Sequence, residues 1–172
     1  MSNWIIYGLS ASLFWGSYAV VSKVVTSEKY LGLSSGQASL LMFGGITIVL
    51  LGYFLWQQKT MSSGIKLIGI LLILLILGYV IYSLKNIGLQ LSLSKLGLGL
   101  LQGILWASGM VMAFLALKAG AEAAKLVPIY NTNTLIAVIL GLALLHEVPA
   151  PEQRLKVIIG AILIVVGGIL CA

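Results

Sequence analysis

The sequence predicts an all-α, polytopic membrane helical bundle with about six transmembrane helices. Hydrophobic residues make up 60% of the 172 residues, charged residues only 8%, and the mean hydropathy is +1.13. A soluble domain normally carries about 25% charged residues, and a chain this short cannot bury so much apolar side chain within itself. The solvent for these side chains is therefore lipid, and the bilayer is the first expected partner.

The charged residues support this interpretation through their positions. The net charge of +6 could suggest nucleic acid, but no basic cluster with interleaved aromatic residues is present, as such a surface would need. The ten Lys and Arg residues come in five spaced pairs near breaks in the apolar sequence, where their stems can extend to lipid headgroups. We expect no nucleic-acid partner.

Six apolar stretches approach the roughly 20 residues that a spanning helix needs. Short polar breaks separate them, so one membrane domain over residues 1–172 is expected. The N-terminal "MSNW" lacks the basic start of a signal peptide, which favours retention of the first stretch as a span. The expected spans are Trp4–Val25, Ala38–Trp56, Leu67–Leu84, Leu96–Leu117, one within Ala124–Leu145, and Val157–Cys171.

The third span, "LIGILLILLILGYVIYSL", is almost entirely bulky and aliphatic. Such a helix is expected to face lipid on most sides.

The first and fourth spans each carry a face of small residues. At 100° per residue, Gly8, Ser12 and Gly16 form one ridge, and glycines of the fourth span lie beside Gln102 and Trp106. Helix packing explains the glycines, but the two large polar side chains need hydrogen-bond partners.

The fifth span begins with "VPIYNTNT", five consecutive hydrogen-bonding side chains after Pro128. Proline predicts that a helix either starts or kinks there. Tyr130, Asn133 and Thr134 share a face with Asn131 at its margin, whereas Thr132 is expected to point away and bond back to its own helix. Hydrogen bonding for assembly alone is one explanation; a polar cavity is the other, and the number of polar groups favours it.

Groups suited to chemistry are scarce. The chain has no Asp, its four Glu residues lie in breaks or at helix ends, and His146 is the only histidine. No span has a central ionisable group of the kind that ion coupling requires, and no nucleophile, base and orienting group are found together. Cys171 is the single cysteine. We expect no enzyme activity, no cofactor and no metal site.

Three stretches together resemble a known family. "FWGSYAVVSK", "ALKAGAEAAKLVPIYNTNTLIAVILGLALLHE" and "GAILIVVGGIL" are similar, in order and spacing, to the EamA-type repeat of the drug/metabolite transporter superfamily. His146 stands where the family usually has Gly before Glu, and the third span is additional to the family's five-helix repeat. Members generally carry two inverted repeats, whereas this chain carries one.

The resemblance implies a carrier for a small polar metabolite, such as an amino acid, a sugar or a nucleotide-linked compound. It would work by alternating access in the cell membrane, assembled from two half-size chains. The alternative is a non-transporting membrane subunit or a lipid-handling accessory protein. The substrate-binding residues are predicted to be Trp15, Gln102, Trp106, Tyr130, Asn131, Asn133 and Thr134. The helix-packing residues are predicted to be Gly8, Ser12, Gly16, Gly99, Gly103, Gly109, Pro128, Gly141 and Gly160.

The distribution of positive charge bears on the assembly. Six spans would place Lys59, Lys66, Lys118 and Lys125 on the side of the termini and six Lys or Arg residues on the other side. The positive-inside rule then gives only a weak preference, with the termini outside. Near balance predicts a homodimer of oppositely inserted copies; a heterodimer with a paralogue is the second possibility.

Overall fold

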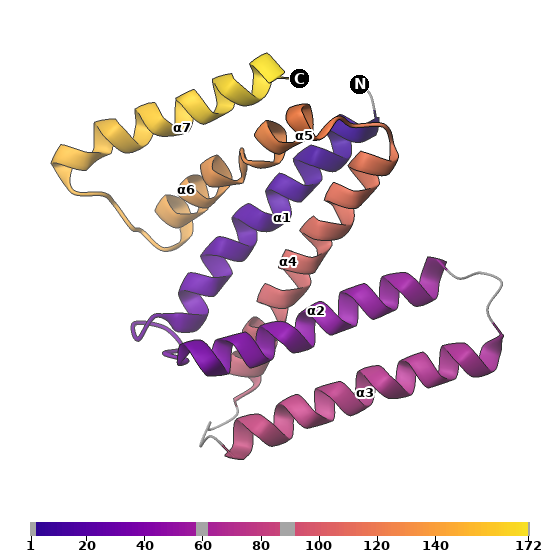
Figure 1. The fold of residues 1–172 in the computed structure, drawn as a ribbon. Coiled ribbons are helices and arrows are strands. Elements are labelled where there is room, and N and C mark those ends of the chain that lie inside the picture. Colours follow the sequence, from indigo (N-terminus) through magenta and orange to yellow (C-terminus); the bar gives the residue numbers. More distant parts are fainter. Residues whose placement is uncertain (1–2, 58–61, 87–91, 172) are drawn as a thin grey trace. The chain divides into compact units, whose positions relative to one another are not determined.

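The structure is a computed structural model that describes residues 3–57, 62–86 and 92–171. Within these ranges the secondary structure is helical, with no strand, and six helical segments are long and apolar enough to cross a membrane (Figure 1). The predicted fold class is confirmed: the chain is a multi-pass membrane protein.

The helices extend beyond the apolar stretches by a few residues at most ends, because polar residues at the boundary continue the helix toward the headgroups. Lys59, one of the charges counted above, lies outside the described residues. The bounds are α1 (Asn3–Thr26), α2 (Ser35–Gln57), α3 (Ser63–Asn86), α4 (Leu93–Lys118), α5 (Ala123–Tyr130), α6 (Asn133–Leu144) and α7 (Pro151–Cys171). The fifth predicted span, Ala123–Leu144 in the structure, is thus divided into α5 and α6.

The chain forms two compact units. Unit 1 comprises Met1–Val20 and Ser108–Ala172, and unit 2 is the continuous stretch Val21–Ala107. Helices α1 and α4 each run from one unit into the other. The units are described one at a time.

Unit 2 contains α2 and α3 lying side by side (Figure 1). Ser34 and Gln37 form a reciprocal cap at the start of α2: the Ser34 N–H donates to Gln37 Oε1 (3.0 Å) and the Gln37 N–H donates to Ser34 Oγ (3.3 Å). The apolar core of this unit is the cluster of Val25, Leu33, Ala38, Leu41, Val80 and Leu84. Only Val80 and Leu84 of α3 are buried, so this helix is exposed on most faces, as its aliphatic sequence predicts.

The α2–α4 crossing in unit 2 brings two backbones into contact. A Cβ built on Gly45 would collide with the carbonyl oxygen of Leu100, and one built on Gly103 would collide with the carbonyl oxygen of Met42. Because a backbone carbonyl cannot move aside as a flexible side chain can, only glycine fits at these two positions.

Unit 1 packs the small-residue ridge of α1 against α5 and α6. A Cβ on Gly8 would lie 3.0 Å from Leu126 Cδ1, and one on Gly16 would lie 2.6 Å from Ile136 Cβ. Between them Ser12 is 1% exposed. Helix α7 packs against both α5 and α6 (Figure 1).

A tight turn follows α6. His146 adopts φ = 53°, in the left-handed region that glycine tolerates best. The N–H groups of Leu145 and Glu147 both donate to the Gly141 carbonyl, at 3.1 and 3.2 Å. The turn therefore forms with histidine at the place where the resembled family usually has glycine.

Candidate functional site

The fifth span is interrupted at Asn131 and Thr132. Helix α5 begins before Pro128 and continues through it for two residues, so no helix starts at the proline and the break follows it. Both interrupting residues keep right-handed dihedrals, φ −69° and ψ −9° for Asn131 and φ −63° and ψ −6° for Thr132. The Thr132 N–H donates to the Ile129 carbonyl (3.2 Å), a shorter-range bond than the α-helical pattern. The backbone therefore makes a tight turn at these two residues, and the α-helical pattern begins again with α6.

Thr132 bonds both to its own helix and to α1. Its hydroxyl donates to the Ile129 carbonyl of its own helix (2.7 Å), as expected. Its hydroxyl oxygen also lies 2.8 Å from that of Ser12 on α1. This interhelical contact was not predicted from the sequence.

An aromatic pocket lies beside the break in unit 1. The rings of Trp15 and Tyr130 meet edge to face, with centroids 5.0 Å apart and planes at 89°. Gly109 of α4 admits the indole, since a Cβ there would lie 2.5 Å from Trp15 Nε1. The pocket has a volume of about 220 Å³ and is lined by Trp15, Met110, Ala113, Phe114, Leu117, Ala123, Leu126, Val127 and Tyr130.

Asn131, which follows α5, and Thr134, in the first turn of α6, are the exposed polar residues around the break. Both are exposed, and the Asn131 side chain makes no hydrogen bond to another described residue. The Thr134 hydroxyl donates to Asn133 Oδ1 at 3.3 Å. Asn133 itself is half-buried, with its backbone carbonyl against Gly16. Below Thr134 a groove of about 280 Å³ follows Ala137, Val138, Gly141 and Leu142 toward Glu147, Pro149 and Val157.

Two predicted substrate-binding residues, Gln102 and Trp106, belong to unit 2. Gln102 is 3% exposed, its Nε2 donates to the Ala38 carbonyl (2.7 Å), and its Oε1 accepts from the Ser22 hydroxyl (3.1 Å). This amide joins α1, α2 and α4, so its surroundings favour a structural role over substrate contact. Trp106 is half-buried.

The predicted packing residues divide into two groups. Gly8, Gly16, Gly99, Gly103 and Gly109 all have a neighbour that an added Cβ would crowd, and Pro128 packs its carbonyl 3.4 Å from the Cβ position of Gly168. Around Gly141 and Gly160, by contrast, nothing among the described residues lies within 4 Å of a Cβ. A packing role for these two glycines stays a prediction.

Sequence reasoning missed the partners of Gly103 and Gln102. Gly45, within the pair Gly44–Gly45 of α2, contacts Gly103. A glycine pair in the middle of an apolar helix is a signal for close backbone approach. The Ala38 carbonyl, in contrast, has no sequence signal, because every residue carries one.

The acidic residues lie away from the middle of the spans. Glu28 follows α1, Glu122 precedes α5, Glu147 precedes α7 and Glu152 is in its first turn. Glu122 pairs with Lys125 at 3.5 Å, and both are exposed. Within the part of the chain that the structure describes, no group of His, Cys, Asp and Glu could hold a metal ion.

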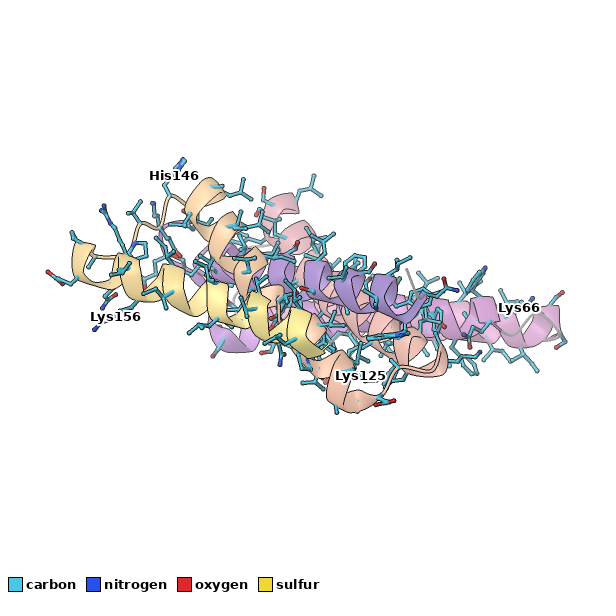
Figure 2. The ribbon with its side chains drawn as sticks, turned by 90° about the horizontal axis from the view of Figure 1, so that it is seen from above. Lys66, Lys125, His146 and Lys156 are labelled. Atoms are coloured by element: carbon cyan, nitrogen blue, oxygen red, sulfur yellow. The ribbon has the colours of Figure 1, made fainter. Side chains whose placement is uncertain are left out.

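Figure 2 shows the side chains of His146 and Lys156 at one end of unit 1, with Lys125 toward the other.

Comparisons with family models, with curated proteins and with solved structures found no match.

Proposed function

We propose that this chain is one half of a membrane carrier for a small polar metabolite, working by alternating access in the cell membrane. The resemblance of its sequence to the EamA-type repeat supports a carrier that pairs with a second half-size chain. The observation that carries the proposal is the interruption of the fifth span at Asn131 and Thr132, beside an aromatic pocket.

The depth of the interruption supports a binding role. The span Ala123–Leu144 has 22 residues, about 33 Å at the helical rise per residue, and Asn131 lies about 12 Å from its start. Irregular backbone at membrane depth is tolerated where protein or a water-filled cavity surrounds it. Carriers commonly place their sites at such interrupted helices near the midplane.

The residues beside the break suit a solute with one polar edge and one apolar face. Trp15 and Tyr130 offer ring surfaces on which the apolar face of a sugar or an amino-acid side chain can pack. Asn131 and Asn133 offer amide donors and acceptors. Aromatic walls are typical of small-molecule pockets; the two asparagines do not line this pocket, and Asn131 directly follows Tyr130, which does.

The acidic residues bear on coupling. Because the four Glu residues lie at span ends, the carrier is proposed to facilitate or exchange neutral or anionic solutes. Proton-driven export of lipophilic cations would need a central carboxylate. Robust efflux of such cations driven by a pH gradient would contradict this part of the proposal.

A lipid-handling role is the second candidate, and one observation favours it. A groove of about 310 Å³ between the start of α1, the α5–α6 break and α7 is almost wholly apolar, which suits an acyl chain. Its lining includes Ile5, Leu9, Ile129, Thr132, Leu135, Val165, Gly168 and Ile169.

Purified protein reconstituted alone in liposomes tests the carrier. A thermal-shift screen of metabolites identifies ligands first, since binding to the folded form raises its stability. Each hit is then tested for solute-specific counterflow. Trp15→Ala should abolish both the shift and the counterflow, whereas Trp56→Ala, at a tryptophan that is 71% exposed, should leave both unchanged. If no solute exchanges, or if both variants behave alike, the proposed site is wrong.

A further inference from the structure

We propose that the groove between the adjoining ends of α2 and α3 binds one anionic phospholipid, with an acyl chain in the groove and the phosphate at Lys66. The site lies within unit 2 and stands whether or not the chain is a carrier. Helix α3 is the span that is additional to the resembled repeat, so the site is a property of this chain rather than of that repeat.

The groove accepts only an apolar occupant. It has a volume of about 180 Å³ and lies between the last turns of α2 and the first turns of α3. The lining comprises Leu51, Phe54, Leu55, Ile65, Ile68, Gly69 and Leu72. These side chains carry no nitrogen or oxygen atom, so a polar solute would lose its hydrogen bonds to water without replacement. A hydrocarbon chain has no such bonds to lose.

The groove opens where α3 is least buried. Toward the end of α3, Val80 and Leu84 are 1% and 0% exposed, and no other residue of this helix is buried. Near its start, α2 contacts α3 at Gly69, where a Cβ would lie 2.6 Å from Leu55 Cδ2. Ile68, beside this contact, is 58% exposed. An acyl chain in the groove supplies the dispersion contacts that this end of the helix pair lacks.

The charged residues of α3 set the depth of the groove. Lys66 and Lys85 are 19 residues apart, about 28 Å along a helix, close to the hydrocarbon thickness of about 30 Å. Lys66, near the end of its helix in Figure 2, therefore lies at the headgroup boundary. Tyr53 and Trp56, with ring centroids 6.2 Å apart, lie at the same end of the pair, as interfacial aromatic residues commonly do. Leu72 lies about 9 Å deeper than Lys66, so the groove runs inward as an acyl chain does.

The charge at this end favours an anionic headgroup. Lys66 is half-buried, whereas Lys85 is exposed. Among the described residues, the Lys66 ammonium has no ion-pair or hydrogen-bond partner. The sequence between Lys29 and Ala121, which includes all of α2 and α3, contains no Asp or Glu. A lysine held against the protein without a carboxylate is complementary to a lipid phosphate.

Lipid retention by the purified full chain tests the headgroup. The chain is titrated in detergent with phosphatidylglycerol or with phosphatidylcholine of identical acyl chains, and native mass spectrometry counts the bound lipids. Phosphatidylglycerol should bind about fivefold more tightly, and Lys66→Gln should remove this preference, because one Lys beside an anionic headgroup contributes about that factor. Lys66→Arg should keep the preference. Lys85→Gln, at the exposed lysine of the same helix, should keep it too.

Blocking the groove tests the acyl chain. Ile68→Trp adds bulk to the lining and should lower the retention of both lipids. Ile70→Trp is the matched control, about 160° away on the same helix and outside the lining, and should leave retention unchanged. Both positions are exposed, at 58% and 49%, so neither substitution disturbs a buried contact. Glycerol 3-phosphate, which has the phosphate but no acyl chain, should not compete with the lipid.

Equal binding of the two lipids by the unaltered chain overturns the proposal, as does a preference that survives in Lys66→Gln. An equal loss in Lys66→Gln and Lys85→Gln would show general attraction to positive charge and also overturn it. Equal retention by Ile68→Trp and Ile70→Trp would reject the groove, and competition by glycerol 3-phosphate would indicate a site for free anions instead. These binding results do not depend on counterflow, so failure of the carrier would leave the lipid site standing.

Discussion

The side-chain amides of the two units have opposite surroundings. In unit 2, Gln102 is enclosed and bonded on both sides, to Ser22 and Ala38. In unit 1, Asn133 and its neighbour Asn131 stand at a helix break, with Asn131 exposed and not bonded within the described part of the chain. Gln102 and the two asparagines all occur in apolar spans, so the sequence alone predicts the same substrate-binding role for all three.

The difference separates a polar side chain whose hydrogen bonds join helices, Gln102, from one that is exposed and can bond to a solute, Asn131. Near Gln102 the backbones of α2 and α4 touch through Gly45 and Gly103, and the amide itself is buried and bonded on both sides. Around Asn131 the helix is interrupted and a pocket of about 220 Å³ lies on the side of Trp15 and Tyr130. Substitutions in unit 2 should therefore lower stability, and those at the break should lower transport.

The largest effect is expected at the glycine crossing. Gly45→Ala places a methyl group against the Leu100 carbonyl and should lower the free energy of unfolding by about 3 kcal/mol or more, the upper range for overpacking. Gly52→Ala is the matched control on the same helix, with nothing within 4 Å of its Cβ, and should be neutral or slightly stabilising. Unfolding in mixed micelles measures both. Equal stability of the two variants would contradict the backbone contact.

Gln102→Leu should have the next largest effect. It leaves the Ala38 carbonyl and the Ser22 hydroxyl without this partner in a buried setting, at a cost of about 2 kcal/mol. Counterflow per folded molecule should be retained. Gln57→Leu, at an exposed glutamine, serves as control. Lost counterflow with unchanged stability would return Gln102 to the substrate site.

Asn131→Ala combined with Asn133→Ala should mainly lower counterflow, whereas Gln102→Leu mainly lowers stability. Loss of amide contacts to a bound solute is expected to reduce counterflow about tenfold, equivalent to about 1.4 kcal/mol. The thermal midpoint should change little for Asn131→Ala alone, because Asn131 is exposed, and should fall slightly for the double variant, because Asn133 is half-buried and accepts from the Thr134 hydroxyl. Preserved uptake at normal protein levels would show that the break does not bind solute.

The smallest effect is expected at the turn after α6. His146→Gly removes the cost of a left-handed residue, about 1 kcal/mol, and should raise the thermal midpoint slightly with counterflow unchanged. His146→Ala should give no such gain, since alanine also disfavours φ = 53°. The difference between these two variants measures the backbone strain of a left-handed alanine less the greater conformational entropy that glycine gives the unfolded chain.

Much of the fold follows from local sequence. Apolar stretches of about 20 residues give the spans, and the aliphatic third span predicts the exposure of α3. The glycine ridge of α1 follows from its spacing. The contact of Thr132 with Ser12, by contrast, joins residues 120 positions apart, which a 100° count along one helix cannot show. The environment of Gln102 depends on a carbonyl, at Ala38, that belongs to another helix.

The candidate site was harder to predict than the fold for the same reason. Trp15 and Tyr130 come together in the structure. Gln102 was predicted to bind substrate for the same reason, its place on a helical face, but its amide is bonded to Ser22 and Ala38. Whether a polar residue in a span is bonded or open is decided by tertiary contacts. A helical wheel shows only which residues share a face.

The Ser12–Thr132 contact has a consequence for biosynthesis. The two residues are 120 positions apart, so at synthesis rates of about 5–20 residues per second the first waits on the order of 10 s for the second. Unit 2 is continuous in sequence and can pack its helices during that interval, whereas unit 1 needs the first span and the last two together. Until then the Ser12 hydroxyl can bond only to its own helix or to transient neighbours. Ribosome-bound chains truncated before α5 should therefore contain a packed unit 2, including the end of α1 from Val21, with the earlier part of α1 still accessible to insertion factors.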